Sequence, residues 1–190
     1  MKRYIIYAGV NGAGKTTLYQ SDLTDEIREM PRVNVDEIVR SFGRWDAPND
    51  VIEAGMRAVG LIHECFKEGK SFNQETTLCG HSILRNIQRA KNDGYFVEIH
   101  YVGVDSPEIA IKRVHQRVLD GGHGISELDI RRRYVESLRN LLVVIPLADK
   151  VEIYDNTKAF ERIASFRDGK CVYKSDKEST WTDAMFTDCN

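Results

Sequence analysis

The sequence predicts an α/β fold with a doubly wound, mostly parallel sheet. Strand-like and helix-like stretches alternate along most of the 190 residues, as in repeated strand-helix-strand units. The clearest strands are residues 4–8 and 95–104, which are rich in β-branched and aromatic side chains. The first of them runs directly into a glycine-rich segment that opens a helix-compatible stretch. A chain of this length fits one domain with a sizeable core.

Composition and charge narrow the class of protein. The 27 basic and 29 acidic residues give a net charge of −2, so no global positive charge favours binding to nucleic acid. The 4 cysteines are scattered without zinc-like spacing, as expected of free thiols in a reducing compartment. No apolar run approaches the ~20 residues of a membrane helix, and the N-terminus lacks a signal-peptide pattern. We therefore expect a soluble cytoplasmic protein with no membrane role.

The glycine-rich segment carries the strongest functional signal. It reads G-x-x-x-x-G-K-T between a strand and a helix, which is the order of a P-loop. Its glycines let backbone amides approach phosphate oxygens, and the helix N-terminus adds partial positive charge. Lys15 would reach the β- and γ-phosphates of a nucleoside triphosphate, and the Thr16 hydroxyl would coordinate Mg²⁺. The predicted nucleotide-binding residues are Gly9, Val10, Asn11, Gly12, Ala13, Gly14, Lys15, Thr16 and Thr17.

The remaining elements can be assigned in chain order. We expect a helix over 16–30, a strand over 31–35, and a helix from about 38. The next helix begins near Asp50 and ends at Gly69, and its expected apolar stripe is Ile52, Met56, Val59, Ile62 and Phe66. Five further elements follow: a weak strand over 71–77, a helix around 83–90, a helix from 105 to 120, a helix capped by Ser126 and a strand at 151–154.

The end of the chain predicts a hairpin and a tail. Residues 160–166 and 171–173 flank Asp168-Gly169, which suggests a hairpin packed on the sheet. The expected organisation is a single P-loop kinase domain over 1–174, with a helical lid over about 106–140, and a polar tail over 175–190. Trp181 and Phe186 are the isolated apolar residues that would anchor this tail.

Two acids follow predicted strands and are candidates for the chemistry. In parallel sheets ligands bind beyond the carboxyl ends of the strands, so Asp36 and Glu75 are expected to face the P-loop. Phosphoryl transfer to an alcohol needs a carboxylate that takes the proton, and we assign this role to Asp36. Its alternative role is an N-cap for the following helix. Glu75 would bind the acceptor hydroxyl or order the water shell of Mg²⁺. Asp105 fits a helix cap better than a second nucleotide-binding acid.

Several arginines could stabilise the transferred phosphoryl group. Arg113 and Arg117 flank the apolar stripe of one predicted lid helix. On the next helix, Arg131 falls inside the apolar face of Leu128, Ile130, Tyr134, Val135 and Leu138, whereas Arg132 and Arg133 fall outside it. A buried arginine needs an anionic partner, so we expect these side chains to lie over phosphates. A basic RNA-binding helix is the other interpretation of residues 131–133. His123 lies between glycines, and either a phosphate contact or no role fits its position.

With these residues in hand, the chain resembles the zeta toxin and related small-molecule kinase family. The resemblance rests on GVNGAGKTT, NVDEIVR, NQETTLCG, GYFVEIHYVGVDSPEIAIKRV, GGHGISELDIRRRYVESLRNL and VEIYDNT. It implies a fold similar to nucleotide and shikimate kinases and phosphorylation of UDP-N-acetylglucosamine by ATP. It also implies that Asp36 is the base, that Glu75 and Thr77 bind substrate, and that Lys15 and Thr16 bind phosphate and Mg²⁺. A family arginine falls on Arg113 or Arg117, and another on Arg131 or in the loop at His123.

The expected function is therefore an ATP- and Mg²⁺-dependent kinase of a small hydroxyl-bearing metabolite. The resemblance favours a UDP-amino sugar as the acceptor, although the compact GGHG loop leaves the acceptor more open than the reaction. Two alternatives remain: a regulatory NTPase or toxin that works with a protein partner such as an antitoxin, and an RNA-end kinase. Nucleic acid is the less expected partner, because acids are interspersed around residues 131–133.

Overall fold

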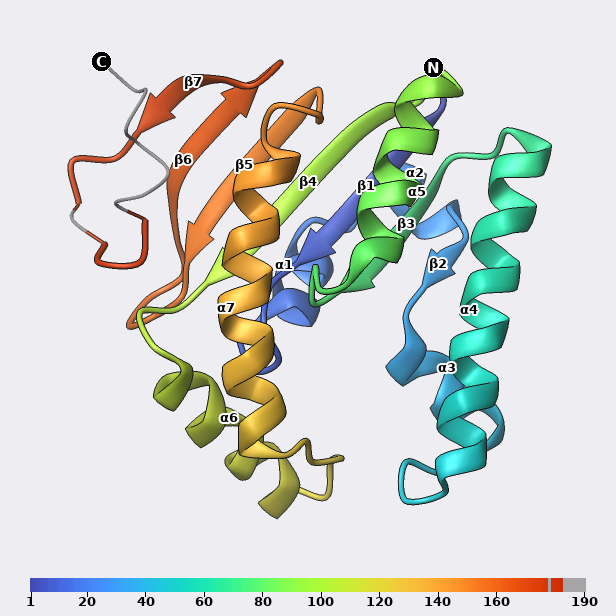
Figure 1. Cartoon of the computed structure of the whole chain (residues 1–190), viewed down its shortest axis with the longest axis vertical. Helices are drawn as coiled ribbons and strands as arrows, with labels where there is room; N and C mark the ends of the chain where they lie inside the picture. Colours follow the sequence, from blue (N-terminus) through green and yellow to red (C-terminus); the bar gives the residue numbers. More distant parts are fainter. Residues whose placement is uncertain (178, 183–190) are drawn as a thin grey trace.

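The computed structural model describes residues 1–177 and 179–182. Its centre is a 7-stranded sheet with the order β2-β3-β1-β4-β5-β6-β7 (Figure 1). The first five strands in this order run parallel, whereas β6 and β7 are antiparallel to their neighbours. The predicted class, α/β with a mostly parallel sheet, is confirmed. The strands are β1 (Arg3–Ala8), β2 (Arg32–Val33), β3 (Phe72–Thr76), β4 (Phe96–Gly103), β5 (Lys150–Asp155), β6 (Glu161–Arg167) and β7 (Lys170–Lys174).

Helices cover both faces of the sheet, so the core has two halves. Apolar residues of α4, α5 and the C-terminal half of α7 pack on one face, and those of α1, α2, α6 and the N-terminal half of α7 pack on the other. None of the helices in the described part of the chain has the length and apolar character needed to cross a membrane. The helices are α1 (Lys15–Ser21), α2 (Asp25–Glu29), α3 (Val35–Phe42), α4 (Pro48–Glu68), α5 (His81–Asn92), α6 (Pro107–Leu119) and α7 (Glu127–Val144).

The segment after the P-loop forms two short helices instead of the single helix expected over 16–30. Helix α1 ends at Ser21, and Thr24 starts α2 by accepting a hydrogen bond from the backbone amide of Ile27. A threonine is a favourable N-cap and competes with continuation of the helix. The two helices therefore change direction and cover the sheet beside β1.

Helix α4 buries only part of the predicted apolar stripe. Ile62 and Phe66 are buried as predicted, whereas Ile52, Met56 and Val59 are 60–70% exposed. The other buried residues of the helix are Ala54, Ala58 and Cys65. Helix α4 packs against α3, and the small alanines leave room for this close packing. The helix also begins at Pro48, ahead of Asp50, whose carboxylate instead accepts a hydrogen bond from the amide of Arg44.

Two other predicted caps can be compared with the structure. Ser126 caps α7 as expected and accepts a hydrogen bond from the amide of Asp129. Asp105 is not the cap of α6, because the N-cap position belongs to Ser106. Asp105 instead accepts a hydrogen bond from Thr180 near the end of the described chain.

The predicted hairpin is present as β6 and β7, and the described tail returns to the sheet. Trp181 is buried against Tyr101 and Gly103, and its indole nitrogen donates to Asp155. Phe186, the other predicted anchor, lies outside the described residues. The cysteines at 65, 79 and 171 are free thiols, and Cys189 also lies outside the described part.

Candidate active site

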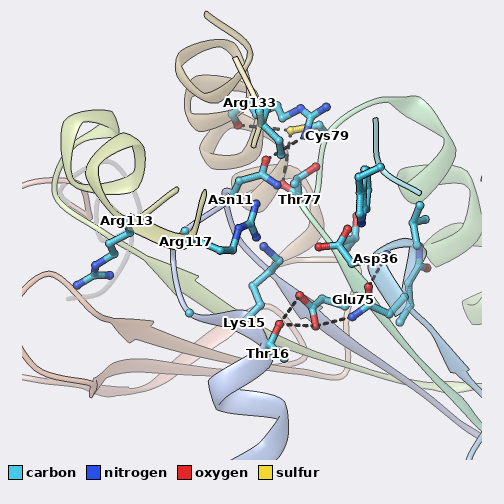
Figure 2. Close-up of a pocket in the computed structure, with 18 of the residues that line it drawn as sticks. Asn11, Lys15, Thr16, Asp36, Glu75, Thr77, Cys79, Arg113, Arg117 and Arg133 are labelled. Atoms are coloured by element: carbon cyan, nitrogen blue, oxygen red, sulfur yellow. Dashed lines mark hydrogen bonds between the residues drawn. The ribbon is translucent and has the colours of Figure 1, made fainter. Parts of the chain in front are cut away.

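A cleft of about 750 Å³ lies beyond the carboxyl ends of β1, β2 and β3. It brings together the P-loop, the start of α3, the loop after β3 and the facing sides of α6 and α7 (Figure 2). This is where parallel sheets place ligands. Predicted site residues that line the cleft are Asn11, Gly12, Gly14, Lys15, Thr16, Thr17, Asp36, Glu75, Thr77, Arg113 and Arg117.

The P-loop runs so close to neighbouring backbone that glycine is required. Gly9 has a φ of 139°, and a Cβ there would lie 2.2 Å from the carbonyl oxygen of Val102. Gly12 has a φ of 81°, and its Cβ would lie 2.6 Å from the carbonyl oxygen of Ala110. Both positions are therefore closed to other residues. The loop is wedged between β4 and α6, and α1 starts directly behind it.

Lys15 is a buried cation at the bottom of the cleft. Its Nζ donates to the carbonyl oxygen of Val10 at 3.2 Å. Burial lowers the pKa of Lys15, while the negative charges of Glu75 and Asp36 oppose this shift and the positive charge of Arg117 adds to it. The acids thus favour the ammonium form, which is the form that binds phosphate oxygens.

Glu75 lies next to Thr16 at the end of β3. The Thr16 hydroxyl donates to its carboxylate at 3.0 and 3.2 Å. Two further donors, Arg32 at 2.7 Å and Asn34 at 3.1 Å, satisfy the same carboxylate. The guanidinium of Arg32 also lies over the ring of Tyr19, 3.4 Å from its centroid. Glu75 is therefore a fixed and largely buried charge beside the P-loop hydroxyl.

Asp36 faces the cleft from the first turn of α3. The cap of this helix is Asn34, whose side-chain oxygen accepts from the Asp36 amide at 2.9 Å. The N-cap role considered for Asp36 is therefore wrong, and its carboxylate is free of that task. The Asp36 side chain is 32% exposed, and the imidazole of His123 lies 3.4 Å from it. The sequence pattern that could have identified this arrangement is Asn-x-Asp after a short strand, because Asn is a preferred cap.

The predicted arginines occupy different places. Arg117 reaches into the cleft close to Lys15, whereas Arg113 is turned toward the loop after β5 (Figure 2). Arg113 donates to the carbonyl oxygens of Asn156 at 2.7 Å and Thr157 at 3.3 Å, and its Nη1 is buried without a hydrogen-bond partner among the described residues. Arg113 thus lies at the edge of the cleft, where it is bonded to the loop after β5.

The expected orientation of Arg131 is wrong. Its guanidinium is exposed and pairs with Glu108 at 2.5 Å, outside the cleft. The apolar face of α7 is narrower than assumed, since Leu128 and Val135 are 79% and 55% exposed. The buried face instead consists of Ile130, Ser137, Leu141 and Val144. Arg131 therefore lies on the outer surface.

Arg133 takes the inward position on α7 that was expected of Arg131. It lines the cleft and donates to the side-chain oxygen of Asn11 in the P-loop at 3.0 Å. Its periodicity alone gave no reason to select it. The signal would have been the P-loop side chain that it faces, which becomes visible only when α7 is docked against the sheet.

Helix α7 also holds the loop after β3 in place. Glu136 accepts from the amide of Gly80 at 2.7 Å, and Asn140 donates to the carbonyl oxygen of Leu78 at 2.8 Å. Leu78 is buried with a φ of 60°, a conformation that costs a non-glycine residue about 1–3 kcal/mol. These contacts fix Thr77 and Cys79 at the rim of the cleft.

His123, for which a phosphate contact or no role was expected, and Trp45, for which no role was predicted, lie together beside Asp36. The imidazole of His123 stacks on the indole of Trp45 with centroids 3.9 Å apart and an interplanar angle of 11°. Trp45 lines the cleft, and its Nε1 is buried without a hydrogen-bond partner among the described residues. Trp45 lies in a loop that gave no periodic signal, so sequence patterns could not place it.

Comparisons with known proteins agree with this fold. An uncharacterized protein of Haemophilus influenzae strain Rd is 35% identical over 130 residues, which cover 68% of this chain and 91% of that protein. A crystal structure of AvrRxo1-ORF1:-ORF2 with ATP matches with a TM-score of 0.67 and 16% identity over 90% of this chain. The match spans only 60% of that longer chain.

A second solved structure comes from the PezAT chromosomal toxin-antitoxin system of Streptococcus pneumoniae. It matches with a TM-score of 0.58 and 20% identity, covering 95% of this chain and 75% of that one. At these identities the two structures support the fold alone. The zeta toxin family model matches residues 2–178, which is nearly the whole described chain. Together with the P-loop and the cleft above the parallel strands, this match shows that the chain belongs to the zeta toxin family of P-loop kinases.

Proposed function

We propose that this protein is an ATP- and Mg²⁺-dependent kinase that phosphorylates a hydroxyl group of a small metabolite. The observation that carries the proposal is the placement of Lys15, Asp36, Glu75 and Arg117 around one cleft. Phosphoryl transfer requires cations around the moving phosphoryl group and a carboxylate near the attacking hydroxyl. The cleft offers both within a partly desolvated space, where charge interactions are stronger than in water.

The P-loop and the basic residues would hold the triphosphate. Asn11, Gly12, Gly14 and the first residues of α1 line the cleft, and a glycine-rich loop that opens a helix binds phosphate. Lys15 would exchange its bond to the Val10 carbonyl for phosphate oxygens. Arg117 and Arg133 reach the same space from α6 and α7. Charge developing on the γ-phosphoryl oxygens would thus be met from three sides.

Thr16 and Glu75 fit a Mg²⁺ ion bound mainly through phosphates and water. Both offer oxygen atoms, which Mg²⁺ prefers, and they already lie within 3.0–3.2 Å of each other. The described residues contain no cluster of three or more His, Cys, Asp and Glu side chains suited to a metal cage. Mg²⁺ bound here would neutralise charge on the β- and γ-phosphates. Glu75 would order its water shell, the second of the two roles considered for this residue.

Asp36 is the proposed general base. The acceptor hydroxyl would transfer its proton to an Asp36 carboxylate oxygen while the hydroxyl oxygen bonds to the γ-phosphorus. The bond between the γ-phosphorus and the β,γ-bridging oxygen breaks, and ADP leaves with that electron pair. Since Asn34 caps α3, the Asp36 carboxylate is available for this proton.

The acceptor side of the cleft suits a small polar metabolite with an apolar part. Trp45, Val51 and Ile125 contribute apolar wall, and Thr77 lies at the rim. The buried Trp45 N–H has no acceptor among the described residues and could bond to a substrate oxygen. A cleft of about 750 Å³ falls within the usual range for small-ligand sites. A UDP-amino sugar such as UDP-N-acetylglucosamine is the acceptor that we propose from the family resemblance.

The test is a transfer assay with γ-labelled ATP, Mg²⁺ and a panel of UDP-sugars, nucleosides and RNA 5′ ends. We expect label on a small metabolite, with a UDP-amino sugar as the first candidate. Asp36→Asn should reduce the rate about 10²–10⁴-fold with little change in ATP binding, whereas Lys15→Ala should lower both. Arg117→Ala should also be impaired, and its matched control Arg131→Ala should transfer like the wild type. If Asp36→Asn transferred at the wild-type rate, the base would be misassigned.

The structure gives no support to the RNA-end alternative. Residues 131–133 form no continuous basic surface, because Arg131 pairs with Glu108 and Arg132 pairs with Asp129 and Glu136. Arg132 and Arg133 both line the cleft, but Arg132 is held by these acidic partners. A regulatory role with a protein partner stays a proposal. It is motivated by two structural neighbours, one described as an ORF1:ORF2 structure and the other as part of a toxin-antitoxin system. Co-expression with the product of an adjacent open reading frame, followed by ATP binding with and without it, tests this role.

A further inference from the structure

His123 connects the two sides of the cleft. It belongs to the loop between α6 and α7, yet its ring lies on Trp45 in the loop between α3 and α4. The His123 side chain is only 5% exposed. A histidine in a loop with three glycines would ordinarily be solvated and mobile. Its burial between two elements therefore calls for a specific explanation.

Arg117 holds the loop by two contacts with the same histidine. Its Nε donates to the His123 carbonyl oxygen at 3.2 Å, and its Nη2 lies 3.2 Å from the His123 Nε2. The amide of Gly122 donates to the Arg117 carbonyl oxygen at 2.8 Å. A Cβ on Gly122 would lie 2.7 Å from the Arg117 Cγ, so a side chain there would push the loop away. The loop is thus built to lie on Arg117.

The His123 Nε2 has two neighbours that make opposite demands. The guanidinium of Arg117 can only donate hydrogen bonds, so it bonds to Nε2 when that nitrogen carries no proton. The carboxylate of Asp36, whose Oδ2 lies 3.4 Å from the same nitrogen, can only accept while it is ionised. A single nitrogen cannot satisfy both neighbours at once. Its protonation state decides which of them it binds.

We propose that His123 is a positioning residue that links the protonation of the site to the availability of Asp36 and Arg117. In the neutral Nδ1–H form, Nε2 accepts from Arg117 and leaves the Asp36 carboxylate free. Protonation at Nε2 breaks the bond to Arg117, repels its guanidinium, and creates an N–H that binds Asp36. The proton-accepting carboxylate is then occupied by a cation from its own chain. This role rests on the proposed kinase function.

The surroundings favour the neutral form near pH 7. Burial lowers the pKa of His123, the negative charge of Asp36 opposes this, and Arg117 and Arg40 lower the pKa further. Asp36 and Arg40 come from α3, Arg117 comes from α6, and the stacked Trp45 is uncharged. Inhibition by protonation is therefore expected below about pH 6.5, the ordinary pKa of histidine.

The first experiment measures the switch without using catalysis. A protonated imidazole stacked on an indole quenches its fluorescence, so Trp45 reports on His123. In a Trp181→Phe background, where Trp45 is the remaining tryptophan, we expect fluorescence to fall as the pH drops from 7.5 to 5. His123→Gln in that background should abolish this change, whereas His63→Gln, at an exposed position on α4, should retain it. Circular dichroism at each pH confirms that the variants stay folded.

The second experiment uses γ-labelled Mg·ATP across the same pH range. It measures either the transfer of the labelled phosphoryl group to an acceptor or its release as phosphate. Glutamine at position 123 can accept a hydrogen bond from Arg117 but cannot be protonated. The ratio of kcat/KM at pH 5.5 to that at pH 7.5 should therefore be at least threefold higher in His123→Gln than in the wild type. His123→Ala, which cannot bond to Arg117, should have a lower kcat at pH 7.5 than His123→Gln.

The two experiments separate the inference from the function on which it rests. Fluorescence that does not change with pH, or that changes equally in His123→Gln, would overturn the proposed switch. So would superimposable pH profiles of wild type and His123→Gln. If neither the wild type nor any variant transferred phosphate, but the His123-dependent fluorescence change were present, the kinase function would be refuted. The protonation-dependent contact of His123 would still hold.

Discussion

Asn34 combines a structural role with a role in the site. Its side-chain oxygen caps α3, and its amide nitrogen donates to Glu75 and to Glu37, each at 3.1 Å. The residue itself is buried. One side chain therefore starts the helix that presents Asp36 and also fixes the carboxylate beside Thr16. The two roles can be separated by substitution, because serine caps helices well but cannot reach Glu75 as an amide does.

Asn34→Ala should lower the free energy of unfolding by about 1–2 kcal/mol, since the cap and a buried donor are both lost. Asn34→Ser should recover about 1 kcal/mol of this through the cap. Urea denaturation of the two variants measures the difference. Both should need more Mg²⁺ for half-maximal activity than the wild type, because Glu75 loses a donor in both. Equal unfolding midpoints for the alanine and serine variants would show that the cap contributes little.

Single residues were predictable where local chemistry decides their position. The P-loop spacing and the acids after two strands led to residues that line one cleft, because parallel strands bring their carboxyl ends together. Arg131 was misplaced because the buried face of α7 was judged from periodicity alone. His123 and Trp45 lie in loops, where side-chain direction depends on tertiary contacts that no local pattern encodes.

At the scale of elements, α4 contains two glycines that no neighbour requires. Gly55 and Gly60 lie inside the helix, and a Cβ at either position would meet no atom within 4 Å. Glycine in a helix interior is less favourable than alanine by about 0.5–1 kcal/mol. We therefore expect Gly60→Ala to raise the free energy of unfolding by about that amount. Thermal and urea denaturation measure it, and a destabilised variant would mean that α4 packs against something at this position.

The contrasting glycine is Gly103 at the end of β4. A Cβ there would lie 2.3 Å from the ring of Trp181, so Gly103→Ala should displace residues 179–182 from the sheet. In a Trp45→Phe background, the emission of Trp181 should move to longer wavelength as the indole becomes hydrated. Gly60→Ala in the same background is the matched control and should keep the wild-type emission. An unshifted Gly103→Ala spectrum would contradict the packing of Trp181 on β4.

Elements were easier to predict than the faces that they bury. Strand β4, the hairpin of β6 and β7, and the Ser126 cap of α7 follow from β-branched runs, turn residues and cap chemistry. The buried face of α4 was predicted only at Ile62 and Phe66, because its packing against α3 buries the small Ala54 and Ala58 and leaves larger apolar neighbours exposed. The break between α1 and α2 likewise could not be predicted from apolar periodicity, because it depends on Thr24 acting as the N-cap of α2.

At the scale of the whole molecule, a buried carboxylate ties three parts of the sheet together. Glu98 on β4 is 3% exposed and contacts Arg3 of β1 at 2.7 Å, Lys150 of β5 at 2.5 Å and His100 at 3.0 Å. Burial alone would raise the pKa of Glu98, but hydrogen bonds from His100, Lys150 and Arg3 outweigh it and hold the pKa far below the usual value. The native state therefore binds a proton at this site much less readily than the unfolded chain.

The pH dependence of stability follows from this difference. Since the native pKa is depressed, the contribution of Glu98 is fully present above the unfolded value of about 4.5 and is lost as the pH falls toward the native pKa. Glu98→Gln should lower the free energy of unfolding at pH 7 by about 3 kcal/mol, the lower end of the usual range for breaking a buried ion pair. Arg3 and Lys150 are partly exposed and can be rehydrated, which limits the cost.

The difference between Glu98→Gln and the wild type should shrink steadily below pH 4.5, because the unfolded wild-type chain takes up a proton at Glu98 that the native state does not, which favours unfolding. Urea denaturation at a series of pH values from 7 to 3 measures this convergence. Glu108→Gln is the matched control, since its partner Arg131 and Glu108 itself are exposed, and its stability should stay close to that of the wild type at every pH. Parallel stability curves for Glu98→Gln and wild type would show that Glu98 is not the group whose protonation destabilises the sheet.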